Sequence, residues 1–397
     1  MKKQLLTSAI AGCFLAASGA AAASDHAGAL EALTGVDING TKLTKDLGID
    51  FGGWVSAGFS WNTGDSSDGQ NGPVTFANRD LEFQMNQLNL FISEEATAGD
   101  NFDLGFRADV MFGTDPQQGS QTEGLDLKLL DSMSSRYDIA IPQVYAELYA
   151  PIGNGVTIKA GHFYTIIGNE VVTAPDNFFY THAYTMQYGE PFTHTGFLAE
   201  TALTDSINIR AGAVNGWDNF NSDADDAWSY IGGADWTSAD GATSLTLASV
   251  VGDTDGAGAT ERWVYSVVAT HDFSDSLHLL IQHDQGEDTI SGTTAAEWYG
   301  VNGYITYDVS ETIGVAIRGE WFQDGGRVGL GDADATVANY AAAQADYYAV
   351  TGGVNYHVNN WLKVRPEVRY DWSSRDAFDN STKDDQLLVS IDTVITF

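Results

Sequence analysis

The chain has 397 residues and a formal net charge of −36, because 54 Asp and Glu oppose 18 Lys and Arg. So acidic a surface repels phosphate backbones and argues against nucleic acid as a partner. A single cysteine excludes a disulfide framework or a thiolate metal cluster, and 43 % hydrophobic residues, with 12 % aromatics, exclude a disordered acidic tail.

Residues 1–23 have the pattern of a secretory signal peptide. Two lysines precede an apolar stretch, and a run of small residues ends at Ala23. A lipobox ending at Cys13 is the competing interpretation, but the apolar run continues past it. Cleavage after Ala23 would leave residues 24–48 as a periplasmic N-terminal segment.

From residue 49 to the end, apolar and polar residues alternate in sixteen segments, and a period of two is typical of β-strands. A phase slip near Gln87 indicates a β-bulge, and Pro366 removes one donor from a strand. The predicted strands are 51–61, 81–92, 102–112, 144–150, 156–163, 195–203, 207–214, 228–237, 243–251, 262–272, 276–284, 297–308, 312–323, 346–357, 361–372 and 386–397.

One face of these strands is polar. In the clearest case, five charged residues alternate with apolar ones between Leu362 and Trp372. Charges on one strand face do not fit a dry sandwich core. They fit a water-filled lumen, with the apolar residues facing lipid. A soluble β-sandwich or propeller would account for the alternation but not for the polar inner face.

The connections alternate in length. Short turns follow the even-numbered strands, and the long connections are 62–79, 113–137, 164–194, 215–227, 252–261, 285–296, 324–345 and 373–385. This pattern predicts an all-β fold: a transmembrane antiparallel β-barrel of about 16 strands (range about 14–18), spanning 49–397, with short periplasmic turns and long extracellular loops. The terminal Phe397 resembles the signal read by the barrel assembly machinery.

Motifs for catalysis or cofactor binding are absent from the sequence. His271-Asp272 and His283-Asp284 are adjacent pairs, and adjacent strand residues point to opposite faces. We therefore expect no enzyme activity, no cofactor and no resident metal. Acidic residues gather in the long connections, where loose Ca²⁺ binding is an alternative to solvated charge; they are Asp223, Asp225, Asp226, Asp253, Asp255, Asp332 and Asp334.

The third long connection, about 164–194, carries six aromatic residues between Phe178 and Phe192. Because exposing that much apolar area is unfavourable, we expect it to fold into the barrel as a constriction. Its acids would then face inward bases across a narrow passage. The candidate constriction and lumen residues are Glu170, Asp176, Glu190, His162, His194, Arg107, Lys159, Arg210, Arg318, Lys363, Arg365 and Arg369.

Four motifs in this region resemble the OmpL-like β-barrel porins of the porin-2 family. The resemblance implies a passive outer-membrane channel and carries over no substrate and no catalytic residue. His162, Glu190 and His194 are candidates from the residues alone. The motifs are Gly161-His162-Phe163-Tyr164-Thr165-Ile166-Ile167-Gly168, Phe178-Phe179-Tyr180-Thr181-His182, Tyr188-Gly189-Glu190-Pro191-Phe192-Thr193-His194-Thr195-Gly196 and Val214-Asn215-Gly216-Trp217-Asp218.

These observations predict a porin in the outer membrane of a Gram-negative bacterium that passes small hydrophilic solutes by diffusion. Inward strand positions are close to charge balance, and the acidic excess lies in the loops, so we expect a mild cation preference. Outer-membrane lipid, lipopolysaccharide, the assembly machinery and, by analogy, two further copies in a homotrimer are the expected partners. A barrel enzyme with a rim site and a structural or adhesive barrel binding divalent cations and lipopolysaccharide are the alternatives.

Overall fold

A computed structural model describes residues 28–118, 123–124, 136–220, 228–253, 260–325 and 344–397. The leader interpretation for 1–23 and the first residues after it lie outside this part of the chain. Within it, no helix has the length and apolar character needed to cross a membrane.

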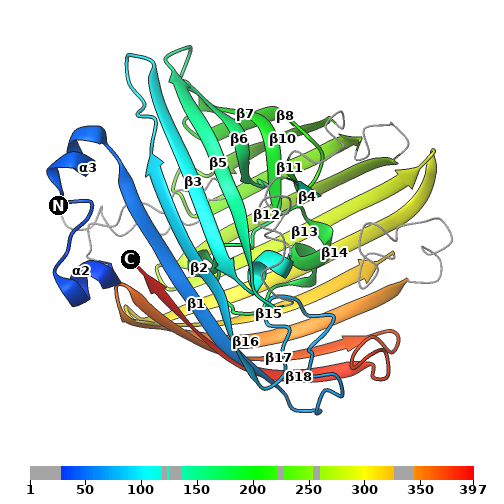
Figure 1. The fold of residues 1–397 in the computed structure, drawn as a ribbon. Coiled ribbons are helices and arrows are strands. Elements are labelled where there is room, and N and C mark those ends of the chain that lie inside the picture. The colour runs from blue at the N-terminus through cyan, green and yellow to red at the C-terminus, as the bar shows by residue number, and fades with distance from the viewer. Residues whose placement is uncertain (1–27, 119–122, 125–135, 221–227, 254–259, 326–343) are drawn as a thin grey trace.

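Sixteen antiparallel strands of the described chain close into one barrel (Figure 1). Neighbours in sequence are neighbours in the sheet, and β1 closes the barrel by pairing with β18. The strands are β1 (Asp50–Asn62), β2 (Glu82–Glu94), β3 (Asp103–Gly113), β5 (Asp138–Ala150), β6 (Val156–Tyr164), β7 (Thr193–Thr204), β8 (Ile207–Val214), β10 (Ser229–Thr237), β11 (Thr243–Asp253), β12 (Thr260–Ser274), β13 (Leu277–Ile290), β14 (Thr293–Ser310), β15 (Ile313–Asp324), β16 (Ala345–Asn359), β17 (Leu362–Ser373) and β18 (Asp385–Thr396).

Short helices, turns and a two-stranded sheet accompany the sixteen strands. Before β1 the chain forms two short helices, and the connections carry a 3₁₀ turn after β3, two short turns between β6 and β7, and a parallel two-stranded sheet. These are α2 (Ala29–Thr34), α3 (Lys42–Leu47), η2 (Asp115–Gln118), η3 (Ala174–Asp176), η4 (Thr185–Gly189), β4 (Glu123–Gly124) and β9 (Asn219–Phe220).

The predicted barrel of about sixteen strands is confirmed, with one error in the connections. The predicted long connection 285–296 is wrong, because β13 and β14 extend until only Ser291 and Gly292 separate them. Both residues have positive φ, 51° and 75°, which suits a two-residue hairpin turn. In addition, β5 begins at Asp138, six residues earlier than predicted.

The two predicted irregularities are present. The register between β1 and β2 shifts after the pair Ser56 and Gln87, leaving Asn86 as the extra residue of a bulge. Pro366 points outward, and the pairing of β16 with β17 is interrupted between Gly353–Glu367 and Tyr356–Val364. The register is the same on both sides of this gap, so the strand tolerates the missing donor.

The strand faces follow the predicted alternation. On β17, Val368 and Tyr370 are exposed on the outer face, whereas Arg369 and Asp371 point inward. The inward residues are buried, however, because the segment between β6 and β7 packs on them. This part of the lumen is therefore filled with protein, whereas the sequence predicted that it would be filled with water.

Candidate functional site

Residues 165–192, termed the inner loop, fold inside the barrel. Phe179, Tyr180 and Tyr184 of this loop are almost fully buried. They contact two strands on the same side of the wall: Tyr180 donates to Asn86 of β2 (2.9 Å), and Tyr184 donates to Asp371 of β17 (2.9 Å). Burial of the aromatic side chains accounts for the departure of this long connection from the barrel rim.

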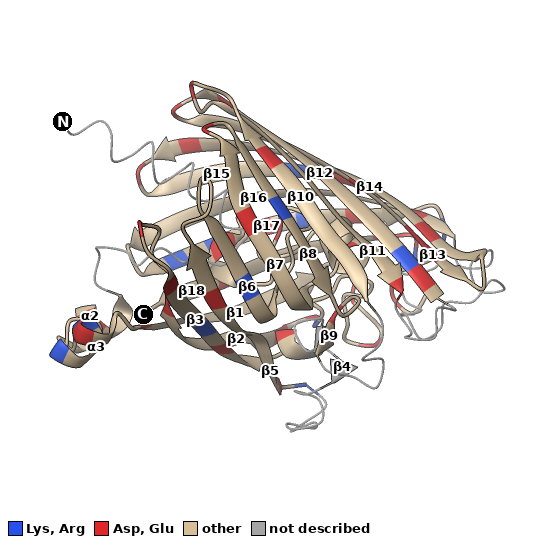
Figure 2. Cartoon of the chain, turned by 90° about the horizontal axis from the view of Figure 1, so that it is seen from above, with Lys and Arg blue, Asp and Glu red and all other residues tan. Residues whose placement is uncertain are grey.

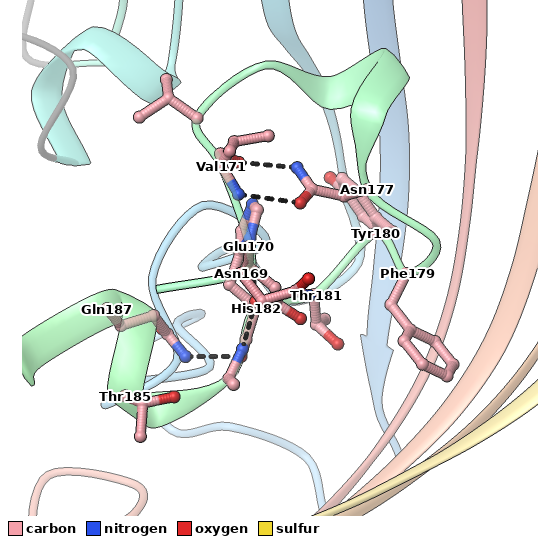
Figure 3. A network of polar contacts seen from close by, with 12 residues as sticks. Asn169, Glu170, Val171, Asn177, Phe179, Tyr180, Thr181, His182, Thr185 and Gln187 are labelled. Carbon is pink, nitrogen blue, oxygen red and sulfur yellow. Dashed lines mark hydrogen bonds and ion pairs between the residues drawn. The ribbon is translucent and has the colours of Figure 1, made fainter. Parts of the chain in front are cut away.

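The inner loop holds its own shape through side-chain bonds to its backbone (Figure 3). The Asn177 side chain accepts from the Val171 amide (3.0 Å) and donates to the Val171 carbonyl (2.6 Å). Gln187 donates to the His182 carbonyl (2.7 Å). These bonds satisfy backbone groups that a buried irregular segment would otherwise leave unpaired.

Glu170 and Arg318, predicted on opposite sides of a passage, are in direct contact. Arg318 Nη1 donates to Glu170 Oε1 (2.5 Å) and to the Thr181 carbonyl (2.8 Å). The Tyr304 hydroxyl and the Ala183 amide donate to the same carboxylate. Burial opposes ionisation, but the Arg318 guanidinium together with hydrogen bonds from His182 and Tyr304 holds the pKa of Glu170 below its ordinary value.

Basic residues of β17 hold the backbone of the inner loop. Lys363 donates to the Pro175 carbonyl (2.7 Å), and Arg369 donates to the His182 carbonyl (2.6 Å). Arg365 donates to three loop carbonyls and also forms a bidentate pair with Asp392 of β18. These bases therefore act on the loop itself, and do not face its acids across open space.

Acidic residues of the same wall bind loop amides. Glu367 accepts from the amides of Tyr180 (2.7 Å) and Thr181 (3.1 Å), and Glu320 accepts from the Tyr184 amide (2.5 Å). Bases on the carbonyls and acids on the amides together fix the loop against β15 and β17, and charge-assisted bonds of this kind are the stronger ones.

The C-terminal part of the inner loop is held by a buried pair of carboxyl groups. Gln282 of β13 donates to Glu190 (2.5 Å) and to Asp284 (2.7 Å). Burial and the neighbouring Asp284 carboxylate raise the pKa of Glu190 well above its ordinary range. Gly168 has φ +81°, and a Cβ there would lie 1.9 Å from the Glu190 carboxyl, so glycine lets the two segments approach.

Asp115 lies in the extracellular connection after β3 and links that connection to the inner loop through two residues of β2. Its carboxyl accepts from Asn86 (2.9 Å) and Gln87 (2.7 Å). Gln87 also donates to the Val172 carbonyl (2.6 Å) of the inner loop. Burial raises the pKa of Asp115 to about 6.

Of three further predicted site residues, Asp176 is exposed, whereas His194 and His162 are buried. Asp176 accepts from the Thr173 hydroxyl. His194 bonds Thr165 (3.0 Å) and the Gly216 carbonyl. His162 is on the outward face of β6, because Lys159 on the inward face differs from it in parity, and its ring stacks on Phe220 at 4.2 Å.

The remaining predicted bases lie on the wall opposite β17. Arg107 pairs with Asp109 (2.7 Å), Arg210 pairs with Asp235 (2.6 Å), and Lys159 lies over the Tyr145 ring at 5.0 Å. All three of these partners belong to the wall itself and not to the inner loop.

Two cavities open on that wall at the end of the barrel with the short turns. One, of about 240 Å³, is lined among others by Glu94, Glu95, Arg107, Glu147, Lys159 and Glu200. The other, of about 410 Å³, is lined among others by Glu200, Asp205 and Asp235. Figure 2 shows acidic residues on turns and strand ends as well as on the walls.

Sequence reasoning missed the residues that anchor the loop through amides and carbonyls, chiefly Gln87, Asn177 and Glu320. The bulge at Asn86 was a signal for Gln87, because it turns two consecutive polar side chains inward. Of the acidic loop residues, Asp253 ends β11, and Asp223, Asp225, Asp226, Asp255, Asp332 and Asp334 lie outside the described residues. The described chain contains no group of three His, Cys, Asp or Glu placed to hold a metal ion.

Comparison with known proteins identifies the family of the chain and supports its fold. The family model described as "putative beta-barrel porin-2, OmpL-like" matches residues 48–397. An anion-selective porin from Comamonas acidovorans is similar in structure, with TM-score 0.59 and 10 % identity over 88 % of this chain and 99 % of that one. OprB of Pseudomonas putida gives TM-score 0.59 and 12 % identity over 90 % and 96 %. The trimer form of OmpT of Vibrio cholerae gives 0.56 and 12 % over 88 % and 99 %. No curated protein matches the chain by sequence.

Proposed function

The chain belongs to the OmpL-like beta-barrel porin-2 family, and from this premise we propose that it passes small hydrophilic solutes by diffusion with a mild preference for cations. As a β-barrel porin it forms a channel in the outer membrane of a Gram-negative bacterium. The short turns then face the periplasm and the long connections face outward.

The observation that supports the cation preference is the lining of the two periplasmic cavities. Six carboxylates line them, Glu94, Glu95, Glu147, Glu200, Asp205 and Asp235, against two basic groups, Arg107 and Lys159; Arg210 compensates Asp235, which leaves a small acidic excess. An excess of one sign between low-dielectric walls raises the local concentration of the opposite ion. Because the carboxylates are exposed or partly exposed to water, salt screens the effect, and the preference is mild.

The inner loop sets the width of this channel in our proposal. Its polar anchors lie on β2, β13, β15 and β17, and the two cavities lie along β3 and β5 to β8, so solutes move along β3 and β5 to β8 in this proposal. Glu170, Arg318, Arg365 and Arg369 then act by positioning the loop, whereas Arg107, Lys159 and Arg210 act on the solute.

A reversal-potential measurement tests this function. Purified protein in a planar bilayer, under a tenfold KCl gradient, should give a reversal potential displaced toward the K⁺ equilibrium value, with the displacement shrinking as salt rises. Glu200→Gln, which removes a charge shared by both cavities, should reduce the displacement. A potential on the Cl⁻ side of zero would contradict the proposal.

The same proposal includes no enzyme activity. His271 bonds Thr243 (2.9 Å), and His283 bonds Tyr265 (3.1 Å) and the Gly300 carbonyl, so neither histidine pairs with its neighbouring aspartate. Lipid or peptide hydrolysis by the purified protein, lost on either His→Ala change, would support a rim enzyme instead.

The assembly proposals rest on the sequence and on analogy. We propose export through residues 1–23, a periplasmic segment 24–48, and recognition of Phe397 by the barrel assembly machinery. A homotrimer surrounded by lipid and lipopolysaccharide is proposed by analogy with trimeric OmpT. Mass measurement of the protein in detergent distinguishes the trimer from a monomer.

A further inference from the structure

The segment before the barrel forms a separate surface element. It comprises α2, α3 and the turn between them, residues 29–49. Figures 1 and 2 both place these helices outside the barrel wall, beside the C-terminal end of the chain, and not across the lumen. All but its last two residues precede the family match, which begins at residue 48.

The segment is fastened to the periplasmic edge of the lipid-facing wall. The Asn39 side chain donates to the Phe51 carbonyl and accepts from the Phe51 amide, both at 2.9 Å. Gly28 packs so closely on the C-terminus that a Cβ there would lie 2.7 Å from Phe397 Cα. Phe51 points outward at the start of β1, so residues 29–49 lie at the periplasmic edge of the lipid-facing surface.

The segment exposes several large apolar side chains. Leu33 is 72 % exposed and Leu43 is 68 % exposed, and Leu47 is also exposed. A groove of about 280 Å³ lies between the segment and the wall, lined among others by Leu30, Val36, Ile38, Leu90 and Phe397. Exposing this area to water is unfavourable, and the groove is continuous with the outer face of β1 and β2, which lipid already covers.

The charges of the segment point to the kind of lipid surface. The chain after residue 23 has 16 basic residues in all, and two of them, Lys42 and Lys45, lie exposed on the six-residue helix α3. Glu31, Asp37 and Asp46 make the segment as a whole net −1, but α3 by itself carries +1, and Lys42 bonds Asp46 one turn on. Lysines beside exposed leucines are typical of elements that lie in the interface of a membrane with anionic headgroups.

We propose that residues 29–49 lie on the periplasmic leaflet of the outer membrane, with Leu33, Leu43 and Leu47 at the acyl boundary and the two lysines at lipid phosphates. The segment then anchors the periplasmic edge of the barrel to phospholipid. The continuity of the groove with the lipid belt favours lipid as its occupant over another protein.

Site-directed spin labelling tests the proposal in the full chain. Cys13 is the only cysteine, so a Cys13→Ala background accepts single labels at Leu33→Cys and Leu43→Cys. The control is Glu311→Cys, an exposed residue on the short turn between β14 and β15. The barrel is refolded into vesicles of phosphatidylethanolamine and phosphatidylglycerol, and collisions with oxygen and with a nickel chelate are measured.

At the two leucine sites we expect oxygen collisions to exceed chelate collisions several-fold, and at Glu311→Cys we expect the reverse. Chelate access at all three sites would overturn the proposal in favour of a segment in water. Exclusion of both reagents at the leucine sites would overturn it in favour of a protein partner. Replacing both lysines by Gln should reduce the oxygen excess in these vesicles, but not in vesicles of phosphatidylcholine alone; an equal effect in both would contradict the role of anionic lipid.

Discussion

Replacing Arg365 by Met is expected to release the middle of the inner loop from the wall. Arg365 Nη1 donates to the carbonyls of Ala174 (2.9 Å), Asn177 (2.8 Å) and Phe179 (3.2 Å). The other guanidinium nitrogens pair with Asp392 (2.8 and 2.6 Å). Met keeps an unbranched stem of similar length but supplies none of these donors.

The size of the effect follows from the bonds that reach the loop. The pair of Arg365 with Asp392 joins two strands of the wall, so the effect on the loop comes from the buried bonds of Nη1 to the loop carbonyls, and a hydrogen bond to a charged group contributes about 1.5–3 kcal/mol. At about 1.4 kcal/mol per factor of ten, a loss of about 1.5–3 kcal/mol shifts the equilibrium between held and released loop roughly ten- to a hundredfold. A loop that is released part of the time gives larger and noisier conductance.

Single-channel recording in a planar bilayer measures this effect, with heat-modifiable migration on gels as the check that the barrel is folded. Arg210→Met is the matched control, because Arg210 forms the same kind of close pair with Asp235 (2.6 and 2.7 Å) on the opposite wall. We expect loop noise in Arg365→Met alone. A folded Arg365→Met channel as quiet as the wild type would refute the anchoring role.

Two pH effects follow from raised pKa values. Protonated Glu190 stabilises the held inner loop below the ordinary pKa of 4.5, and this stability is lost as pH rises through the raised folded pKa. Conductance should therefore increase at alkaline pH, and Glu190→Gln should remove this dependence. An unchanged pH profile in the variant contradicts the assignment. The pKa of Asp115 is raised from 3.8 to about 6. Ionisation of its carboxyl should therefore lower the free energy of unfolding by roughly 3 kcal/mol as pH rises through that window. Denaturant unfolding at both ends of the window should show this loss in the wild type and not in Asp115→Asn; equal losses would count against it.

The strands could be predicted from the sequence because a period of two, sustained over sixteen segments, is incompatible with a helical fold. The turn at Ser291 and Gly292 could not, since it lies in a polar stretch that is equally typical of a loop. Alternation places a residue on a face of the wall, and this assigned Arg369 and Asp371 inward correctly. It does not say what covers that face.

The inner loop was predicted from its aromatic residues, but its contacts were not. Whether Arg318 faces water or Glu170 depends on where a connection of nearly thirty residues passes through the lumen, and no local pattern encodes that path. His162 is a different case: its parity relative to Lys159 already placed it outward, and the motif around it concealed this.

An inner loop that narrows an open diffusion channel is the basis of the proposed function, and single-channel conductance is its sharpest test. The wild-type protein and a variant lacking residues 170–190 are compared in the same bilayer and salt. We predict ohmic steps for both, with a larger step and a higher solute size limit for the deletion. A silent but folded wild-type barrel, or equal conductance in the two proteins, would show that the loop does not narrow an open channel.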